Sequence, residues 1–203
     1  MSTMARRRKK RKQSLYEFKP DPKGTNYLKR LYMTRLQRLT ILKWATFAMT
    51  GVLLLVIQDV IMSQVRFSGA TTDLPVAFIL LVGLYEGLEK GSVFTLAASL
   101  FYWFSGSAPT PICVALLCIL VIVIGLFRQL YWHRSFGSIA MCTSICIMLY
   151  EMALFVIGLA SGLTIMPRVS VFALTGGITC ITMLPMYPLV RVISKIGGES
   201  WRD

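Results

Sequence analysis

Six long apolar runs follow residue 40 and are separated by short polar or glycine-containing links. They cover residues 41–62, 74–88, 92–104, 112–127, 138–160 and 171–190. A helix that crosses the ~30 Å hydrocarbon core of a bilayer needs about 20 residues. The first, fifth and sixth runs reach that length, and the middle three fall short. We expect the three short runs either to border a thinned or water-accessible region or to extend through polar ends. The pattern predicts an all-α integral membrane protein with about six transmembrane helices.

The first 40 residues have a different pattern. Residues 1–26 contain a run of adjacent basic residues followed by Pro20, Pro22 and Gly24. Like charges repel and cannot bury a core, so this segment is predicted to be a disordered, basic cytoplasmic leader. The basic run consists of Arg6, Arg7, Arg8, Lys9, Lys10, Arg11 and Lys12. We expect it to contact anionic lipid or an acidic face of a cytoskeletal partner.

Residues 27–40 carry apolar side chains at steps of three and four, which predicts an amphipathic juxtamembrane helix at the cytoplasmic interface. A helix that binds a partner or extends into solvent is the alternative. Residues 41–203 then form the six-span membrane domain. The basic leader is long and no small-residue cleavage site follows a short apolar core, so the first span is expected to remain as an anchor.

The distribution of basic residues predicts the topology. The chain has 203 residues, 55% of them hydrophobic, and a net charge of +13. Basic residues of multispanning proteins concentrate in the cytoplasmic loops. With six spans and a cytoplasmic N-terminus, 20 of the 22 Lys and Arg residues lie inside, and only Arg66 and Arg168 lie outside. Treating residues 92–127 as one interrupted span gives a poorer division of 16 against 6, so both termini are predicted to be cytoplasmic.

Catalytic motifs are absent from the sequence. The one histidine, His133, lies in a basic loop, and no phosphate-binding glycine motif or metal-binding helix motif is present. The five cysteines lie within apolar runs, where they are expected to pack as small hydrophobic residues. We therefore expect no enzymatic activity, cofactor or metal. Nucleic-acid binding is not expected either, because no groove-reading fold accompanies the charge.

Few ionisable side chains interrupt the runs. Glu151 lies near the middle of the fifth run, where a charge is expensive. It is either a proton or cation site, a buried contact to another subunit, or a protonated or hydrogen-bonded packing residue. Asp73 precedes Leu74 and a proline, which is typical of a helix cap. Glu86 is expected to pair with Arg128 or a residue of the leader.

Small residues indicate possible packing faces. Gly158 and Gly162 form a GxxxG pattern at the end of the fifth run, and Ser138, Cys142 and Cys146 repeat every four residues in the same run. Such stripes allow close approach of helices in membranes. They serve either internal packing or an interface with a partner.

Several short segments resemble the family of the rod-shape-determining membrane protein MreD. They are LLLVIQ at 53–58, ending at Gln58; TDLP at 72–75; YEGLEKG at 85–91; FSG at 104–106; and LPMYPLVR at 184–191, which contains Tyr187. The resemblance covers roughly residues 53–196. One departure is Tyr102, which stands where many members have an Asp shortly before the Ser-Gly pair.

The resemblance implies a scaffold of the bacterial cell-elongation machinery in the plasma membrane. Its direct partner would be a single-span protein similar to MreC. Through that partner it would couple the MreB filament to peptidoglycan synthesis by a class B penicillin-binding transpeptidase and a RodA-type polymerase. The family fold is similar to that of substrate-binding subunits of energy-coupling-factor vitamin transporters.

That similarity supplies the alternative function, a vitamin-binding transporter subunit. Such a subunit should carry polar and aromatic residues around an outer cavity, and Tyr102 and Trp103 lie near the predicted outer side. It often has two alanines four residues apart on its first helix. Here Met49 follows Ala45 at that spacing, so the motif is missing.

Overall fold

The computed structural model describes residues 35–62, 64–65, 69–131 and 136–196. The chain divides into two units, Met1–Arg35 and Leu36–Asp203, and the description below concerns the second. The predicted leader, with Arg6–Lys12, and residues 27–34 of the predicted juxtamembrane helix lie outside the described residues. Residues 35–40 belong to the first helix, which continues into the first apolar run without a break.

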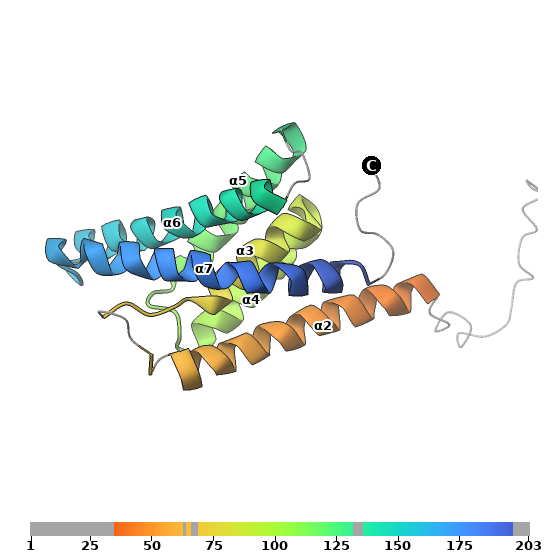
Figure 1. Cartoon of the computed structure of the whole chain (residues 1–203), viewed down its shortest axis with the longest axis horizontal. Helices are drawn as coiled ribbons and strands as arrows, with labels where there is room; N and C mark the ends of the chain where they lie inside the picture. The colour runs from red at the N-terminus through yellow and green to blue at the C-terminus, as the bar shows by residue number, and fades with distance from the viewer. Residues whose placement is uncertain (1–34, 63, 66–68, 132–135, 197–203) are drawn as a thin grey trace, which may run out of the picture. The chain divides into compact units, whose positions relative to one another are not determined.

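Each predicted apolar run contains one α-helix, and the described part of the chain forms no β-strand (Figure 1). The helices are α2 (Arg35–Ile57), α3 (Leu74–Glu86), α4 (Leu88–Phe104), α5 (Ile112–Tyr131), α6 (Phe136–Ala160) and α7 (Val169–Ser194). A π-helical turn, η2 (Gln58–Met62), follows α2, and a 3₁₀ turn, η3 (Met166–Arg168), precedes α7. The predicted all-α class is therefore confirmed.

Three helical segments are long and apolar enough to cross a membrane. They are Gln37–Met62, Phe136–Ala160 and Met166–Ser194, with 26, 25 and 29 residues. The segments Leu74–Glu86 and Ile112–Leu126 are shorter apolar helices. The helices of the second and third runs are thus short as predicted, with 13 and 17 residues, whereas α5 continues past its apolar run to 20 residues.

The connection between α3 and α4 differs from the prediction. Between the second and third apolar runs, the residues Glu89, Lys90 and Gly91 predict a tight turn. In the structure, α4 already begins at Leu88 and includes these three residues. The turn is the single residue Gly87, which has φ of 84° and ends α3 as well as starting α4. Glycine adopts this left-handed region without strain, whereas a side chain there would be disfavoured. The two helices are consequently held as a close pair.

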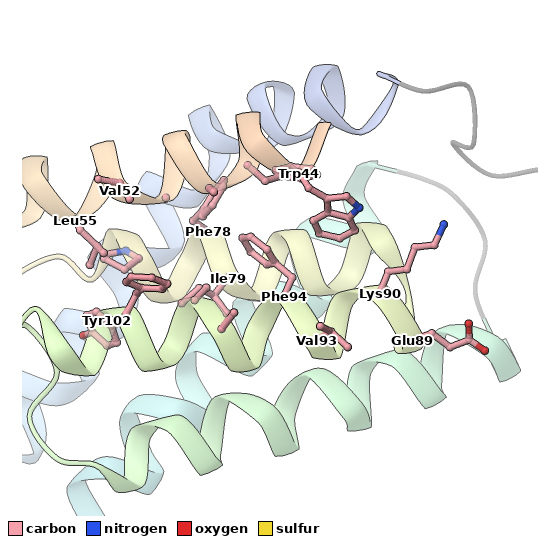
Figure 2. A pocket seen from close by; sticks show the side chains of 17 residues that line it. Trp44, Val52, Leu55, Phe78, Ile79, Glu89, Lys90, Val93, Phe94 and Tyr102 are labelled. Carbon is pink, nitrogen blue, oxygen red and sulfur yellow. The ribbon is translucent and has the colours of Figure 1, made fainter. Parts of the chain in front are cut away.

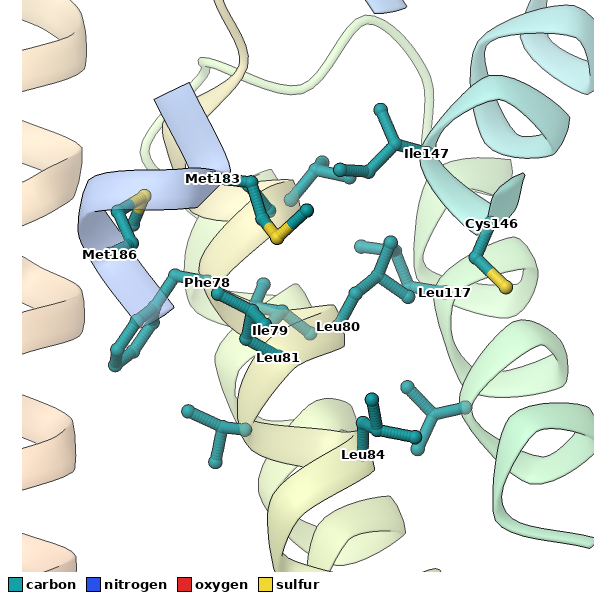
Figure 3. Close-up of a cluster of buried hydrophobic side chains, with 14 of the residues drawn as sticks. Phe78, Ile79, Leu80, Leu81, Leu84, Leu117, Cys146, Ile147, Met183 and Met186 are labelled. Atoms are coloured by element: carbon teal, nitrogen blue, oxygen red, sulfur yellow. The ribbon is translucent and has the colours of Figure 1, made fainter. Parts of the chain in front are cut away.

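The core is centred on α3, whose residues from Leu74 to Tyr85 are all buried. This helix packs against α4, α5, α6 and α7. Figure 3 shows its side chains between Met183 and Met186 of α7 and Ile147 of α6. A helix that is apolar around its whole circumference is expected in such a central position.

Two glycines permit the closest approach in the core. A Cβ atom at Gly91 of α4 would lie 2.6 Å from the carbonyl oxygen of Gly83 in α3. A Cβ atom at Gly83 would lie 2.8 Å from both methyl groups of Val121 in α5. Helices α3 and α4 therefore pack backbone against backbone, and the α3 backbone directly contacts the Val121 side chain of α5, as small residues allow in membrane bundles.

Helices α6 and α7 lie side by side (Figure 1) and contact each other through small residues. The Cys180 thiol donates a 3.6 Å hydrogen bond to the Ser144 carbonyl. A Cβ atom at Gly176 would lie 2.7 Å from the Met148 sulfur. On α6, Cys146 is buried in the core. This part of the predicted small-residue stripe serves packing within the bundle.

The tight Gly83–Gly91 approach yields a stability prediction. Gly91→Ala should lower the thermal midpoint of the detergent-solubilised protein, because overpacking of a close contact typically destabilises by about 1–3 kcal/mol. The matched control is Gly177→Ala in α7, where an added Cβ meets no atom within 4 Å. Size-exclusion chromatography after stepwise heating measures both midpoints. Equal midpoints for the two variants would contradict the proposed close packing.

Candidate functional site

The start of α3 is a buried polar cluster built by Asp73 and its neighbours. A helix leaves its first N–H groups without intrahelical partners, and these groups need partners when they are buried. The Asp73 Oδ1 atom accepts from Val76 N–H at 3.4 Å, so Asp73 caps α3 as its sequence position predicts. The N–H of Leu74 donates to Gln58 Oε1 at 3.2 Å. Pro75 has no N–H, so its backbone nitrogen needs no acceptor in this first turn.

The same aspartate ties α3 to α4 and α7. The hydroxyl of Tyr102, in α4, donates to Asp73 Oδ2 at 2.7 Å. The N–H of Asp73 donates to Thr179 Oγ1 of α7 at 3.0 Å. Tyr102 and Thr179 are both buried. In a water-poor interior, these bonds satisfy groups that would otherwise be strongly destabilising.

Gln58 connects the end of α2 to the same cluster. Besides accepting from Leu74, its side-chain amide donates to the Thr72 carbonyl. Gln58 begins the π-helical turn η2, where the backbone departs from the regular α-helix. Its neighbour Asp59 accepts from the Ser107 hydroxyl at 2.6 Å, which links η2 to the loop after α4. We name Gln58, Asp73, Tyr102 and Thr179 the outer latch, after the side on which the topology predicted from the sequence would place it.

Two further polar residues lie near the outer latch in α6. Tyr150 is fully buried, and its hydroxyl lies near the Cys113 thiol without meeting hydrogen-bond geometry with any described group. Glu151 is 4% exposed and close enough to Asp73 to interact electrostatically. The Glu151 side chain packs against Gly176 of α7. It therefore faces the bundle interior, and the three roles proposed for it from the sequence stay predictions.

The opposite end of α3 carries a buried ion pair. Lys43 Nζ of α2 lies 2.6 Å from Glu86 Oε2, with the side chains only 9% and 5% exposed. The partner expected for Glu86 was Arg128 or a leader residue. The partner that the structure shows is Lys43, which lies in the first apolar run. Nearby, the rings of Tyr85 and Tyr187 are 5.8 Å apart. Tyr187 is buried, so this candidate partner residue packs internally.

A lateral groove lies between α2 and α4, with α3 as its floor (Figure 2). It encloses about 650 Å³. Helix α2 is the least closely packed of the described α-helices. Polar contacts connect it to α3 at Lys43, its ninth residue, and at Gln58, directly after its last residue. Near its middle, α2 also contacts the bundle through an aromatic cluster: Trp44, Phe47, Phe78 and Phe94.

The predicted GxxxG face is not formed. Gly158 lies in α6, but Gly162 lies beyond the helix end at Ala160, in a turn with φ of 70°. The carbonyl of Gly158 accepts from the N–H groups of Leu163 and Thr164 at 2.8 and 3.2 Å. The two glycines thus end a helix, which is a common use of glycine after a C-terminus. They do not present one helical surface to a partner.

Sequence reasoning found some members of the site and missed others. Gln58 and Asp73 were candidates and are brought together, whereas Tyr187 lies at the other end of α3. Thr179 and the Tyr102–Asp73 bond were not predicted, since a threonine within an apolar run is usually bonded to its own helix. Lys43 gave a signal, because a lone lysine inside a predicted span requires a partner. Among the described residues, no group of three or more His, Cys, Asp or Glu is placed to hold a metal.

Comparison of the chain with protein-family models, with curated proteins and with solved structures finds no match in any of the three. The resemblance to the MreD family therefore depends on the short segments named above.

The outer latch yields a prediction from a pair of tyrosines. Tyr102→Phe removes a partner from the buried Asp73 carboxylate and should destabilise the bundle by about 1–3 kcal/mol. Tyr150→Phe is the matched control, because it removes a buried hydroxyl that lacks a hydrogen-bond partner. Thermal midpoints in mild detergent should fall for Tyr102→Phe and stay within error for Tyr150→Phe. An equal loss in both variants would mean that the hydroxyl–carboxylate bond is unimportant.

Proposed function

We propose that this protein is a non-enzymatic membrane scaffold of the bacterial cell-elongation machinery. Its partner is a single-span, MreC-like protein, which connects it to an MreB filament and to peptidoglycan synthases. The observation that carries this proposal is the convergence of the segments that resemble the MreD family. Gln58 ends the first of these segments, and its side chain bonds Thr72 and Leu74 of the second in the outer latch.

The other segments meet at the opposite end of α3. Tyr85 lies in one segment and Tyr187 in another, and their rings are in contact. Gly91, the last residue of the segment at 85–91, approaches Gly83. Residues scattered over more than a hundred positions thus combine into the contacts that fix one bundle. This supports treating the resemblance as a shared fold instead of a chance match of short strings.

A scaffold role is also consistent with the polar side chains, which bond the helices of the bundle to one another. The described bonds of Asp73, Gln58 and Lys43 join one helix to another. They stabilise the bundle, while apolar side chains cover the outer faces of α2 and α4. In a membrane, a partner helix would associate with such faces through van der Waals packing, since lipid tails are as apolar as the partner.

The vitamin-transporter alternative has less support from the groove. The ionic residues that line the groove are Glu89 and Lys90, which lie at one end of it, and the other lining residues are apolar or aromatic. The Tyr102 hydroxyl is directed to Asp73. A polar vitamin would require several convergent polar groups.

The proposed orientation has six spans in the plasma membrane and both termini in the cytoplasm. The Lys43–Glu86 end of α3 then lies near the inner surface, and the outer latch lies toward the outside. Single cysteines at Ala108 and Ser200, in a chain freed of its native cysteines, test this arrangement. An impermeant maleimide applied to intact spheroplasts should label Ala108→Cys and not Ser200→Cys. Labelling of Ala108→Cys only after the inner surface is opened would exclude the six-span topology.

Depletion tests the function itself. Cells that lose this protein should widen and stop elongating, and the tagged protein should co-purify in mild detergent with a single-span MreC-like protein. A width change that wild-type protein reverses, with partner capture, supports the scaffold. Normal width and elongation together with loss of uptake of one vitamin would instead establish the transporter subunit.

A further inference from the structure

We propose that the groove between α2 and α4 is a binding site for one anionic phospholipid, with an acyl chain in the groove and the phosphate at its inner end beside Lys90. The inference depends on the membrane orientation proposed above and not on the scaffold role. It is carried by the size of the groove, its lining and the position of its charged end.

The size of the groove favours a chain thinner than a helix. The lining extends along α4 from Glu89 to Tyr102, about thirteen residue rises or roughly 20 Å. A volume of about 650 Å³ over that length gives a mean cross-section of roughly 33 Å². An α-helix of about 10–12 Å diameter has a cross-section of roughly 80–110 Å². The groove therefore accommodates an extended hydrocarbon chain and excludes a whole helix.

The lining contains no polar group that an acyl chain would leave unsatisfied along most of its length. Small residues, Ala48 and Gly51 on α2 and Ala97 on α4, keep the groove open between the two helices. Tyr102 lines the groove, but its hydroxyl is already bonded to Asp73. The groove is also preformed, because polar contacts at Lys43 and at Gln58 fix α2 relative to α3.

The charged residues lie at one end only. In Figure 2, Lys90 and Trp44 extend at the same end of the groove, and the Glu89 carboxylate points away from both. In the proposed topology this end faces the cytoplasmic leaflet, whose anionic lipids attract basic side chains. Tryptophan is typical of the membrane interface, where a headgroup would lie. A phosphate there would add to the interactions that Lys90 already makes.

Lipid retention by the purified full-length protein tests the site. The protein is stripped in detergent, exposed to mixed micelles containing phosphatidylglycerol or phosphatidylcholine, and measured by native mass spectrometry. Wild type should retain one phosphatidylglycerol in preference to phosphatidylcholine. Ala97→Leu should abolish this retention by filling the groove, and Lys90→Ala should weaken it about fivefold, as expected for one basic contact near a membrane surface.

Matched controls separate the groove from general lipid adhesion. Ala115→Leu adds the same bulk at an exposed position of α5, and Lys195→Ala removes an exposed charge near the end of α7. Both should retain lipid as wild type does. Retention unchanged in Ala97→Leu, or equal for the two lipids and insensitive to Lys90→Ala, would overturn the proposal. A co-purified protein helix that crosslinks to Ala97→Cys in place of lipid would also overturn it.

The result of the lipid-retention experiment does not depend on the result of the depletion experiment that tests the scaffold role. Loss of lipid retention in Ala97→Leu with unchanged cell width would support the lipid site and leave the scaffold role to the depletion experiment. If Ala108→Cys labelling contradicted the topology, Lys90 would face the outer leaflet and the assignment of an inner-leaflet lipid would fail.

Discussion

The structure depends on satisfying the first N–H groups of a helix that begins inside the protein. Helix α3 is buried along its length, so water does not reach these groups. Asp73, Gln58 and Thr179 supply the acceptors from three different segments, and Pro75 removes one donor. Because each acceptor comes from a different part of the chain, capping one helix also fixes the positions of α2 and α7. Tyr102 then holds the capping carboxylate from α4.

The helical content and the six helices follow directly from the apolar runs, and the cap at Asp73 follows from its proline two positions later. The turn at Gly87 was misplaced because residues 89–91 look equally suited to a turn. Only tertiary packing shows that Gly91 is required within α4, against the backbone of Gly83. The GxxxG pattern failed for a related reason: glycine serves both close packing and helix ends, and spacing alone does not distinguish them.

The candidate site was predicted only in part, because its contacts join residues far apart in the sequence. Gln58 and Asp73 drew attention as polar residues at the borders of apolar runs. Their partner Thr179 lies 106 positions from Asp73, and nothing local indicates that pairing. The groove is also a property of packing, since its lining residues look like ordinary lipid-facing positions. It exists because α2 contacts α4 through the rings around Phe94, while small side chains on both helices leave space beside that contact.

The unequal helix lengths affect how the protein responds to bilayer thickness. Helix α3, with 13 residues, is roughly 20 Å long, whereas α7, with 26, is roughly 39 Å long. A short helix exposed to lipid would force the bilayer to thin, but α3 is enclosed by other helices. Hydrophobic mismatch therefore acts on the outer helices, which accommodate it by tilting. A change in membrane thickness would alter the tilt of α2 and α7. Helix α3, which is enclosed by other helices, would not have to match the new thickness.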